Sequence, residues 1–400
     1  MEALPQNVSK DHLTITLGNT QPKSSENERE NSLSIPIDIM IEIFSRLPWK
    51  SMARCRCVSK HWGSILRCPD FTELFFSMAL ARPQLLFASL QNKLVFYSAP
   101  QPQNPNENSS PLVASYHHMS FRFDMYNYEI CNHVNGLILL KHLRKEKGEN
   151  VLVICNPSTG QCLSLPKVDT SNEWVMSYFW YDPVEKQYKV LSVTRSDGFE
   201  EYQVLTLGEP SWRMIECCRP HIHYSRHVCI NGVLYFTASV TEFLEDHMVV
   251  CFDVKSEKLR FIEEGTETFI RKGFQTLINY NGKLALVTSS FIYRTSDSIE
   301  LWVLEDVDKQ EWSKHTCVFP SLAQSLGKGA YLRFVGVTRT NEIVLASRCQ
   351  ITEPFFYVFY CNIKRKTIVR LQIQGIEASE RTNIYTFVEH VENVKLLQVI

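Results

Sequence analysis

Four side chains that can bind a metal ion gather in one short stretch of the sequence. The stretch HIHYSRHVC contains His221, His223, His227 and Cys229, and imidazole and thiolate are the usual ligands of zinc. The alternative interpretation is a loop that enters a β-strand and carries unrelated histidines. We favour this second interpretation, and the sequence therefore predicts no bound metal.

The remaining chemistry-bearing residues do not form a catalytic or cofactor motif. None of the thirteen cysteines has C-x-x-C spacing, whereas a RING-type zinc ligase needs several Cys/His pairs at defined spacing. A nucleophile such as Cys57 needs a base and an orienting group, and nothing nearby in the sequence supplies them. The stretch SLGKGAY at 325–331 lacks the first Gly and the Ser or Thr of a phosphate-binding loop. We therefore predict a protein that is not an enzyme and has no cofactor.

Composition and charge narrow the class of protein. A hydrophobic content of 44% and an aromatic content of 12% over 400 residues predict a well-packed globular chain. The net charge of −1 argues against binding to nucleic acid through overall charge. The N-terminus has no basic start with an apolar run, and no apolar stretch approaches a membrane span. With scattered cysteines in odd number, this predicts an intracellular protein of the nucleus and/or cytoplasm.

The elements that must support function begin with a helical region over residues 32–70. Pro36 suits a first helical turn, and an apolar stripe at helical spacing follows until Pro48 stops the helix. Ser51 is placed to cap a second helix, and Pro69 marks the end of the region. The stripe is formed by Ile39, Ile43, Phe44 and Leu47. So short a region buries too little surface to be stable alone, so its apolar faces need a partner within this chain or outside it.

The run IP-x-x-I-x-x-x-I-F-x-x-LP-x-KS-x-x-R-x-RCVSK-x-W closely resembles the F-box. F-box proteins are the substrate-recruiting subunits of Skp–cullin–F-box (SCF) ubiquitin ligases, so the resemblance implies docking to a Skp-type linker protein. The residues that it assigns to linker binding are Ile35, Pro36, Ile39, Ile43, Phe44, Leu47, Pro48, Ser51, Arg54, Val58 and Trp62. The motif is completed by Lys50, Arg56, Cys57, Ser59 and Lys60. Ile35 and Met52 stand where Leu is usual, and Cys55 stands where an aromatic residue is usual.

After Pro83 the pattern changes to paired β-hairpins. Short β-branched and aromatic runs alternate with turn residues, and three Asn-Gly pairs predict tight turns. The turn of the second hairpin recurs at intervals of roughly 50 residues, which is typical of the four-stranded blades of a β-propeller. These turns lie near Asn156, Gly208, Asp253, Asp306 and Asn362. A sixth unit fits before the first, and we expect the tail at 384–391 to close the ring by pairing with the first blade.

The same region resembles the plant F-box-associated domain of type 3, the kelch-like type. NGL, NPSTGQ, YDP…YKVL, CINGVLYF, NGKLALV and LWVLED…EWSK stand in the expected order, although the Gly-Gly pairs of kelch repeats are absent. The resemblance implies an α+β multidomain chain, in which a short helical F-box precedes a mostly antiparallel, six-bladed kelch-like β-propeller. The expected division is a disordered tail over 1–31, F-box and linker helices over 32–82, and the propeller-like domain over 83–400.

These resemblances imply a non-catalytic substrate adaptor of an SCF ubiquitin ligase. The helices would bind the Skp-type linker and through it a cullin–RING ligase, and the β domain would bind an unknown target protein, with loops 100–111, 142–150 and 318–330 as expected contact regions. One alternative is a propeller that binds a small ligand or acts as an enzyme, with the helices as a structural cap. Another alternative is nucleic-acid binding. It rests only on the net charge of +4 over residues 32–68, which contain six basic and two acidic residues. We expect neither a nucleic acid nor a membrane as partner.

Overall fold

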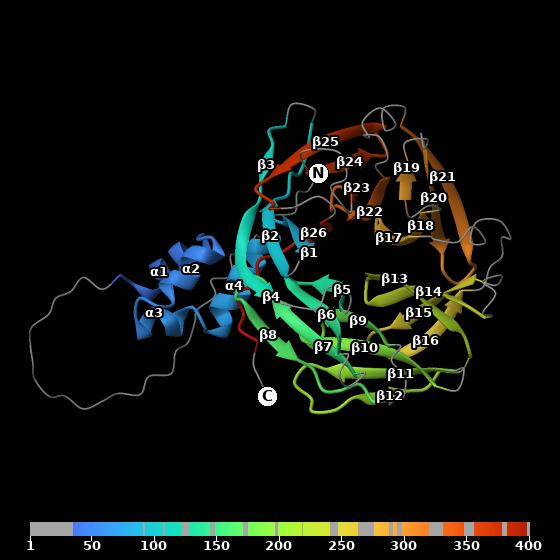
Figure 1. The fold of residues 1–400 in the computed structure, drawn as a ribbon, viewed down its shortest axis with the longest axis horizontal. Coiled ribbons are helices and arrows are strands. Elements are labelled where there is room, and N and C mark those ends of the chain that lie inside the picture. Colours follow the sequence, from blue (N-terminus) through green and yellow to red (C-terminus); the bar gives the residue numbers. More distant parts are fainter. Residues whose placement is uncertain are drawn as a thin grey trace, which may run out of the picture.

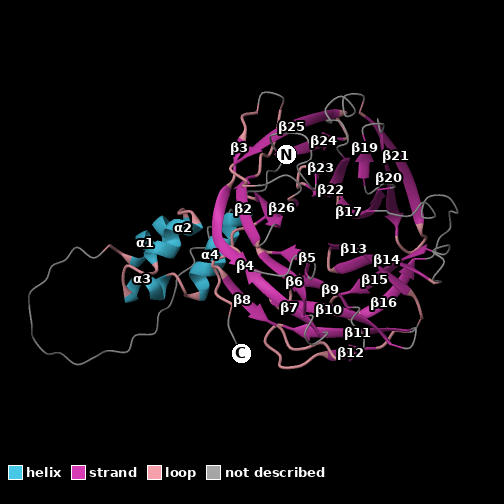
Figure 2. Cartoon of the chain, viewed as in Figure 1, coloured by secondary structure: helices cyan, strands magenta, loops and turns pink. Residues whose placement is uncertain are grey.

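The computed structural model has short helices beside a ring of β-sheets (Figure 1). Helices are confined to the N-terminal part of the described chain, and strands make up the ring (Figure 2). The structure describes residues 35–90, 93–106, 109–121, 128–144, 149–170, 175–196, 199–217, 219–240, 247–262, 276–287, 291–293, 298–319, 331–347, 356–377 and 382–397. The tail predicted over 1–31 lies outside these residues.

The helical region differs from the sequence prediction in two local details. Its elements are α1 (Ile37–Ser45), α2 (Trp49–Cys55), α3 (Lys60–Ile65) and α4 (Pro69–Leu80). Helix α2 begins directly after Pro48, so Ser51 lies inside the helix and does not cap it. Pro69 opens α4 and does not end the region, because proline is well tolerated in a first helical turn. Ser59 caps α3, since its hydroxyl accepts a hydrogen bond from the Trp62 amide at 3.1 Å.

The strands form six antiparallel blades, which confirms the predicted six-bladed β-propeller behind short N-terminal helices. The first blade contains β26 (Asn383–His390), β1 (Gln84–Leu90), β2 (Leu94–Pro100) and β4 (Ser115–Phe121), and the second contains β5 (Tyr128–Val134), β6 (Leu137–Arg144), β7 (Glu149–Asn156) and β8 (Gln161–Ser164). The third contains β9 (Val175–Asp182), β10 (Gln187–Ser196), β11 (Phe199–Thr206) and β12 (Arg213–Ile215), and the fourth contains β13 (Ile222–Ile230), β14 (Val233–Ser239), β15 (His247–Asp253) and β16 (Lys258–Ile262). The fifth contains β17 (Thr276–Tyr280), β18 (Lys283–Val287), β20 (Ser298–Asp306) and β21 (Glu311–Val318). The sixth contains β22 (Tyr331–Val337), β23 (Glu342–Ser347), β24 (Phe356–Asn362) and β25 (Thr367–Gln374), flanked by β19 (Phe291–Tyr293) and β3 (Leu112–Val113).

The ring is closed by strands from opposite ends of the described chain. Strand β26 pairs antiparallel with β1, with Phe387 opposite Leu86 and Tyr385 opposite Ala88. This confirms that the tail completes the first blade. Strand β26 also contacts β5 and β22, the innermost strands of the neighbouring blades. Closure therefore removes the exposed sheet edges that an open array of blades would leave.

Two kinds of turn explain the repeat that is visible in the sequence. In the Asn-Gly turns, Asn135, Asn231 and Asn281 all have φ near +50°, and each is followed by a glycine with positive φ, as tight hairpin turns require. In the second kind, a side-chain oxygen at the end of a strand accepts hydrogen bonds from backbone amides two or three residues later. The residues that do so include Asn156, Asp182, Asp253, Asp306 and Asn362.

Apolar clusters fill the spaces between neighbouring blades. Phe87 and Phe356, for example, join the first and sixth blades, with ring centroids 5.8 Å apart. Trp180 and Phe252 join the third and fourth blades at 5.7 Å. Comparable buried clusters lie at the other four blade boundaries. Because the driving force is proportional to the apolar area removed from water, these clusters hold the ring together without a single central core.

Candidate functional site

The four helices share a small apolar core, and this core includes residues from the other end of the described chain. Phe44 of α1 packs edge-on against Trp62 of α3, with ring centroids 5.0 Å apart. The buried members of the core are Met40, Phe44, Met52, Ile65, Leu66, Phe71, Phe75, Ala79, Val391 and Val394. Val391 and Val394 follow the closing strand β26, so the propeller chain supplies part of the partner that the short helices need.

The segment 391–397 joins the helices to the turns of the second blade. The Arg56 guanidinium donates hydrogen bonds to the carbonyls of Val394 at 2.6 Å and Leu66 at 3.1 Å. On the other side of the segment, the Asn156 amide donates to the Asn393 carbonyl at 2.9 Å. The Asn393 amide in turn donates to the Asn135 carbonyl at 2.8 Å. Buried backbone groups of this irregular segment are therefore satisfied from both sides.

A second contact fixes helix α2 against the first blade. The Trp49 ring stacks in parallel on the His117 imidazole of β4, with centroids 5.0 Å apart. His117 is itself held between the Ser98 hydroxyl at 2.9 Å and the Pro157 carbonyl at 3.2 Å. Burial raises the pKa of the neighbouring Glu392 carboxyl, while hydrogen bonds from Gln84 and the Trp49 amide oppose that shift. The helices are therefore anchored to the ring by several independent contacts.

The helical region exposes apolar side chains that no other described residue covers. Ile39 and Ile43 of α1 are four residues apart and 51% and 47% exposed, so they lie on one side of that helix. Ile35, which precedes α1, is 50% exposed. Ile37 is 41% exposed, and Val58, between α2 and α3, is 64% exposed. We call Ile39 and Ile43 the docking face. Exposed apolar side chains that lie together are typical of surfaces that bind another protein.

The eleven residues that the sequence assigns to linker binding separate into three groups in the structure. The exposed ones are Ile35, Pro36, Ile39, Ile43, Pro48, Arg54 and Val58, and the half-buried ones are Leu47, Ser51 and Trp62. Phe44 is only 3% exposed and belongs to the helical core. Ile37, which the motif did not assign, is also exposed. Because it lies two residues before Ile39, it is on a different side of α1.

The histidine stretch also separates in the structure. His221 and His223 are buried and lie beside Glu200 of β11, which the sequence did not single out. His227 packs edge-on against the Tyr178 ring with centroids 4.5 Å apart, and Cys229 is exposed. The four residues therefore do not form one cluster.

Known protein families match the helical region and the propeller separately. The F-box domain model matches residues 32–74, and the F-box associated beta propeller domain model matches residues 84–391. This chain belongs to the F-box protein family. Among relatives from Arabidopsis thaliana, F-box protein At5g65850 is 51% identical over 99% of both chains. F-box protein DOR is 48% identical over 99% of this chain and 100% of its own. Putative F-box protein At3g23960 is 44% identical over 98% of both.

One solved structure shows a distant resemblance to this F-box protein. A lectin from Aleuria aurantia gives a TM-score of 0.38 at 8% identity, covering 75% of this chain and 98% of the lectin. Within the described residues, no helix has the length and apolar character needed to cross a membrane. Of the loops expected to contact a target, residues 107–108, 145–148 and 320–330 lie outside the described residues.

Proposed function

We propose that this F-box protein is a substrate-recruiting adaptor of an SCF ubiquitin ligase inside the cell. The observation that carries the proposal is the docking face, because it places uncovered isoleucines on the element that matches the F-box. Burying such a face against a Skp-type linker protein would give about 25 cal/mol for each Å² of apolar surface removed from water. Exposed polar and charged residues around it, such as Arg54 and Lys60, would orient the partner at the rim.

The anchoring of the helices supports the same role. An adaptor of this kind adds no catalytic group, and it raises the effective concentration of the target near the ligase. That effect is larger when the linker-binding element and the target-binding element keep a fixed relative orientation. The Trp49–His117 stack and the Arg56–Val394 hydrogen bond provide such a fixed connection. We accordingly assign the F-box and linker helices to 32–82 and the target-binding propeller to 83–400, with segment 391–397 shared between them.

Co-purification with a linker protein tests the proposal. The full chain would be co-expressed with a Skp-type linker, comparing wild type, Ile39→Asp and Val184→Asp. Ile39 lies on the docking face, whereas Val184 is a 71% exposed apolar residue in a propeller turn, so it serves as a matched control. Leu47 is a poorer choice for this test, because it packs against the helical core.

We expect wild type and Val184→Asp to retain the linker and Ile39→Asp to lose it, with unchanged melting temperatures for all three. A folded wild-type chain that captures no linker would contradict the adaptor role. In that case the alternative of a ligand-binding propeller with a helical cap would gain weight. Retention of the linker by Ile39→Asp would show that a different face of the helices is used.

A further inference from the structure

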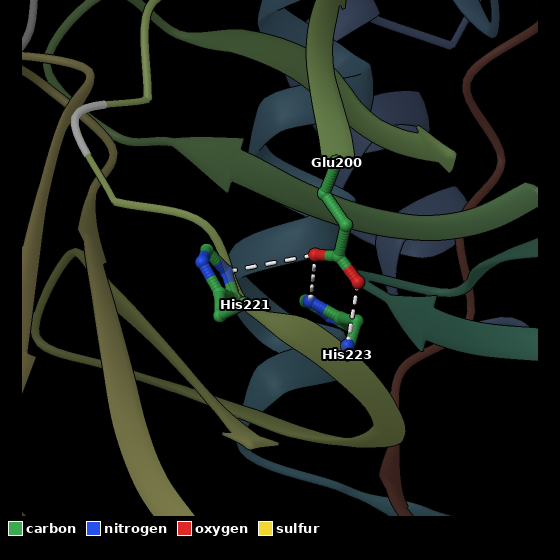
Figure 3. Close-up of side chains that lie close together, drawn as sticks. All are labelled: Glu200, His221 and His223. Atoms are coloured by element: carbon green, nitrogen blue, oxygen red, sulfur yellow. Dashed lines mark hydrogen bonds and ion pairs between the residues drawn. The ribbon is translucent and has the colours of Figure 1, made fainter. Parts of the chain in front are cut away.

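Two histidines and a glutamate meet in the interior where the third blade packs against the fourth. Glu200 lies near the start of β11, and His221 and His223 lie at the start of β13 (Figure 3). Their side chains are at most 1% exposed. The Glu200 Oε2 atom is 3.5 Å from His221 Nε2 and 3.6 Å from His223 Nδ1. Three groups that can each donate a lone pair therefore converge from two blades.

Hydrogen bonds outside the cluster turn these lone pairs toward its centre. His221 Nδ1 donates to the Arg219 carbonyl at 2.8 Å, so the lone pair of the neutral ring lies on Nε2. In this structure that nitrogen is hydrogen-bonded to the Tyr202 hydroxyl. His223 Nε2 is hydrogen-bonded to the Tyr178 hydroxyl. In the tautomer that donates its Nε2 proton to this hydroxyl, the lone pair lies on Nδ1, 3.6 Å from Glu200 Oε2. A histidine held in this way through its other ring nitrogen is the usual arrangement of a metal ligand.

The hydrogen bonds within the protein leave one atom of this cluster unsatisfied. His223 Nδ1 is buried and has no hydrogen-bond partner among the described residues. A proton on His223 Nδ1 would not form a hydrogen bond to Glu200, because the distance of 3.6 Å between Nδ1 and Glu200 Oε2 is too long. The Glu200 carboxylate uses its other oxygen to accept the His223 amide at 2.5 Å (Figure 3). A cation between the three groups would satisfy Nδ1 and balance the buried carboxylate.

We propose that Glu200, His221 and His223 bind a structural zinc ion that joins the third and fourth blades. Two ligand atoms of a tetrahedral zinc ion with bonds of about 2.0–2.2 Å lie about 3.3–3.6 Å apart, which agrees with the separations of Glu200 Oε2 from His221 Nε2 and from His223 Nδ1. Two imidazoles and one carboxylate select zinc over magnesium or calcium, which prefer oxygen ligands. The Tyr202 hydroxyl, 3.3 Å from Glu200 Oε2 and 2.5 Å from His221 Nε2, stands at the remaining side. Because the cluster is enclosed, the ion would stabilise the blade boundary and would not serve as an open catalytic centre.

Metal analysis of the full chain tests this site without any substitution. The protein would be purified without a histidine tag, dialysed against EDTA, and titrated with Zn²⁺ or with Mg²⁺ as the comparison ion. We expect one zinc per chain by elemental analysis after removal of free metal, and a melting temperature several degrees higher with Zn²⁺ but not with Mg²⁺. Absence of retained zinc, with the same melting temperature in Zn²⁺ and EDTA, would overturn the proposal.

Two variants then locate the ion. Glu200→Gln keeps the size of the side chain and removes its charge, so we expect zinc retention to fall at least tenfold. Cys229→Ser alters the exposed cysteine of the same sequence stretch and should retain zinc as wild type does. The reverse pattern, with zinc lost from Cys229→Ser and kept by Glu200→Gln, would overturn the assignment. If Glu200→Gln does not fold, the visible absorption spectrum of the Co²⁺-loaded wild type tests the site instead. A tetrahedral Co²⁺ site absorbs strongly in the visible range, whereas an octahedral surface site absorbs weakly. Weak absorption would overturn the proposal.

Discussion

Arg56, at the end of helix α2, donates a hydrogen bond of 2.6 Å to the carbonyl of Val394, which lies 338 residues later in the chain. The same guanidinium donates to the Leu66 carbonyl. Both acceptors belong to irregular backbone, and Val394 is also part of the helical core. One side chain therefore connects the helices of the F-box to the segment that follows the last propeller strand.

Removal of this side chain should destabilise the whole chain. Because hydrogen bonds from a charged donor contribute about 1.5–3 kcal/mol each, we expect Arg56→Ala to lower the free energy of unfolding by about 2 kcal/mol or more. Arg54→Ala, an exposed neighbour on the same helix, should change it by less than about 0.5 kcal/mol. Urea denaturation of both variants checks this, and equal stabilities would show that the contact has no energetic importance.

Gly136 tests how closely segment 391–397 approaches the second blade. Its φ is +82°, and a Cβ atom there would lie 2.8 Å from Asn393 Cβ and even closer to the Val391 carbonyl oxygen. Gly160 has a similar φ of +75° with open space around it. We expect Gly160→Ala to cost about 1 kcal/mol for backbone strain alone. Gly136→Ala should cost clearly more and speed proteolysis of the segment after β26. Similar melting temperatures for the two variants would disprove the close approach.

Ile43 and Phe44 are neighbours in sequence but should respond to substitution in opposite ways. Phe44→Ala removes a ring from the helical core, so we expect a loss of about 3–5 kcal/mol in the free energy of unfolding. Ile43→Asp changes an exposed residue of the docking face and should leave stability within about 0.5 kcal/mol of wild type. The linker should be lost only from Ile43→Asp when both are tested under conditions where they are folded. Calorimetry and co-purification measure the two effects separately.

Acidification should lower the stability of the closed ring, because histidines are buried near the closing strand β26. His390 of β26 is fully buried, and neither ring nitrogen has a partner among the described residues. Burial, together with nearby His133 and His117, holds the pKa of His390 well below its usual value. Burial likewise lowers the pKa of His133 to about 4. The unfolded chain therefore takes up more protons than the folded chain as the pH falls below about 6.5, and stability falls with it.

Replacing His390 should reduce this dependence on pH. We expect His390→Leu to remove up to about 1.4 kcal/mol per pH unit from the slope of stability against pH below about pH 6.5. Urea denaturation between about pH 5 and about pH 7.5 gives the slopes. A slope for His390→Leu that equals the wild-type slope would exclude His390 as a source of acid sensitivity.

Local patterns in the sequence predict the blades well and the site only in part. The Asn-Gly pairs and the recurring Asn and Asp turns predict the hairpins, because these turns depend on backbone conformations that few residues adopt. The motif does not show that Ile43 faces outward while Phe44 faces inward, since that depends on how α1 packs on α3. Glu200 could not be found from the sequence, because it meets His221 and His223 only through the packing of two blades. Ser51 was misplaced because Pro48 begins the helix earlier than the Ser pattern suggests.

The closing strand has a consequence for how the protein is made. During synthesis, strand β1 emerges early, but its partner β26 is among the last described elements to appear. Until residues 383–397 have left the ribosome, the first blade lacks its inner strand and the helices lack Val391 and Val394. The nascent chain must therefore hold exposed blade edges and an incomplete helical core for most of its translation, which makes it a natural client for chaperones. A premature stop before Asn383 would remove the closing strand and two residues of the helical core, so the ring and the helices would be damaged together.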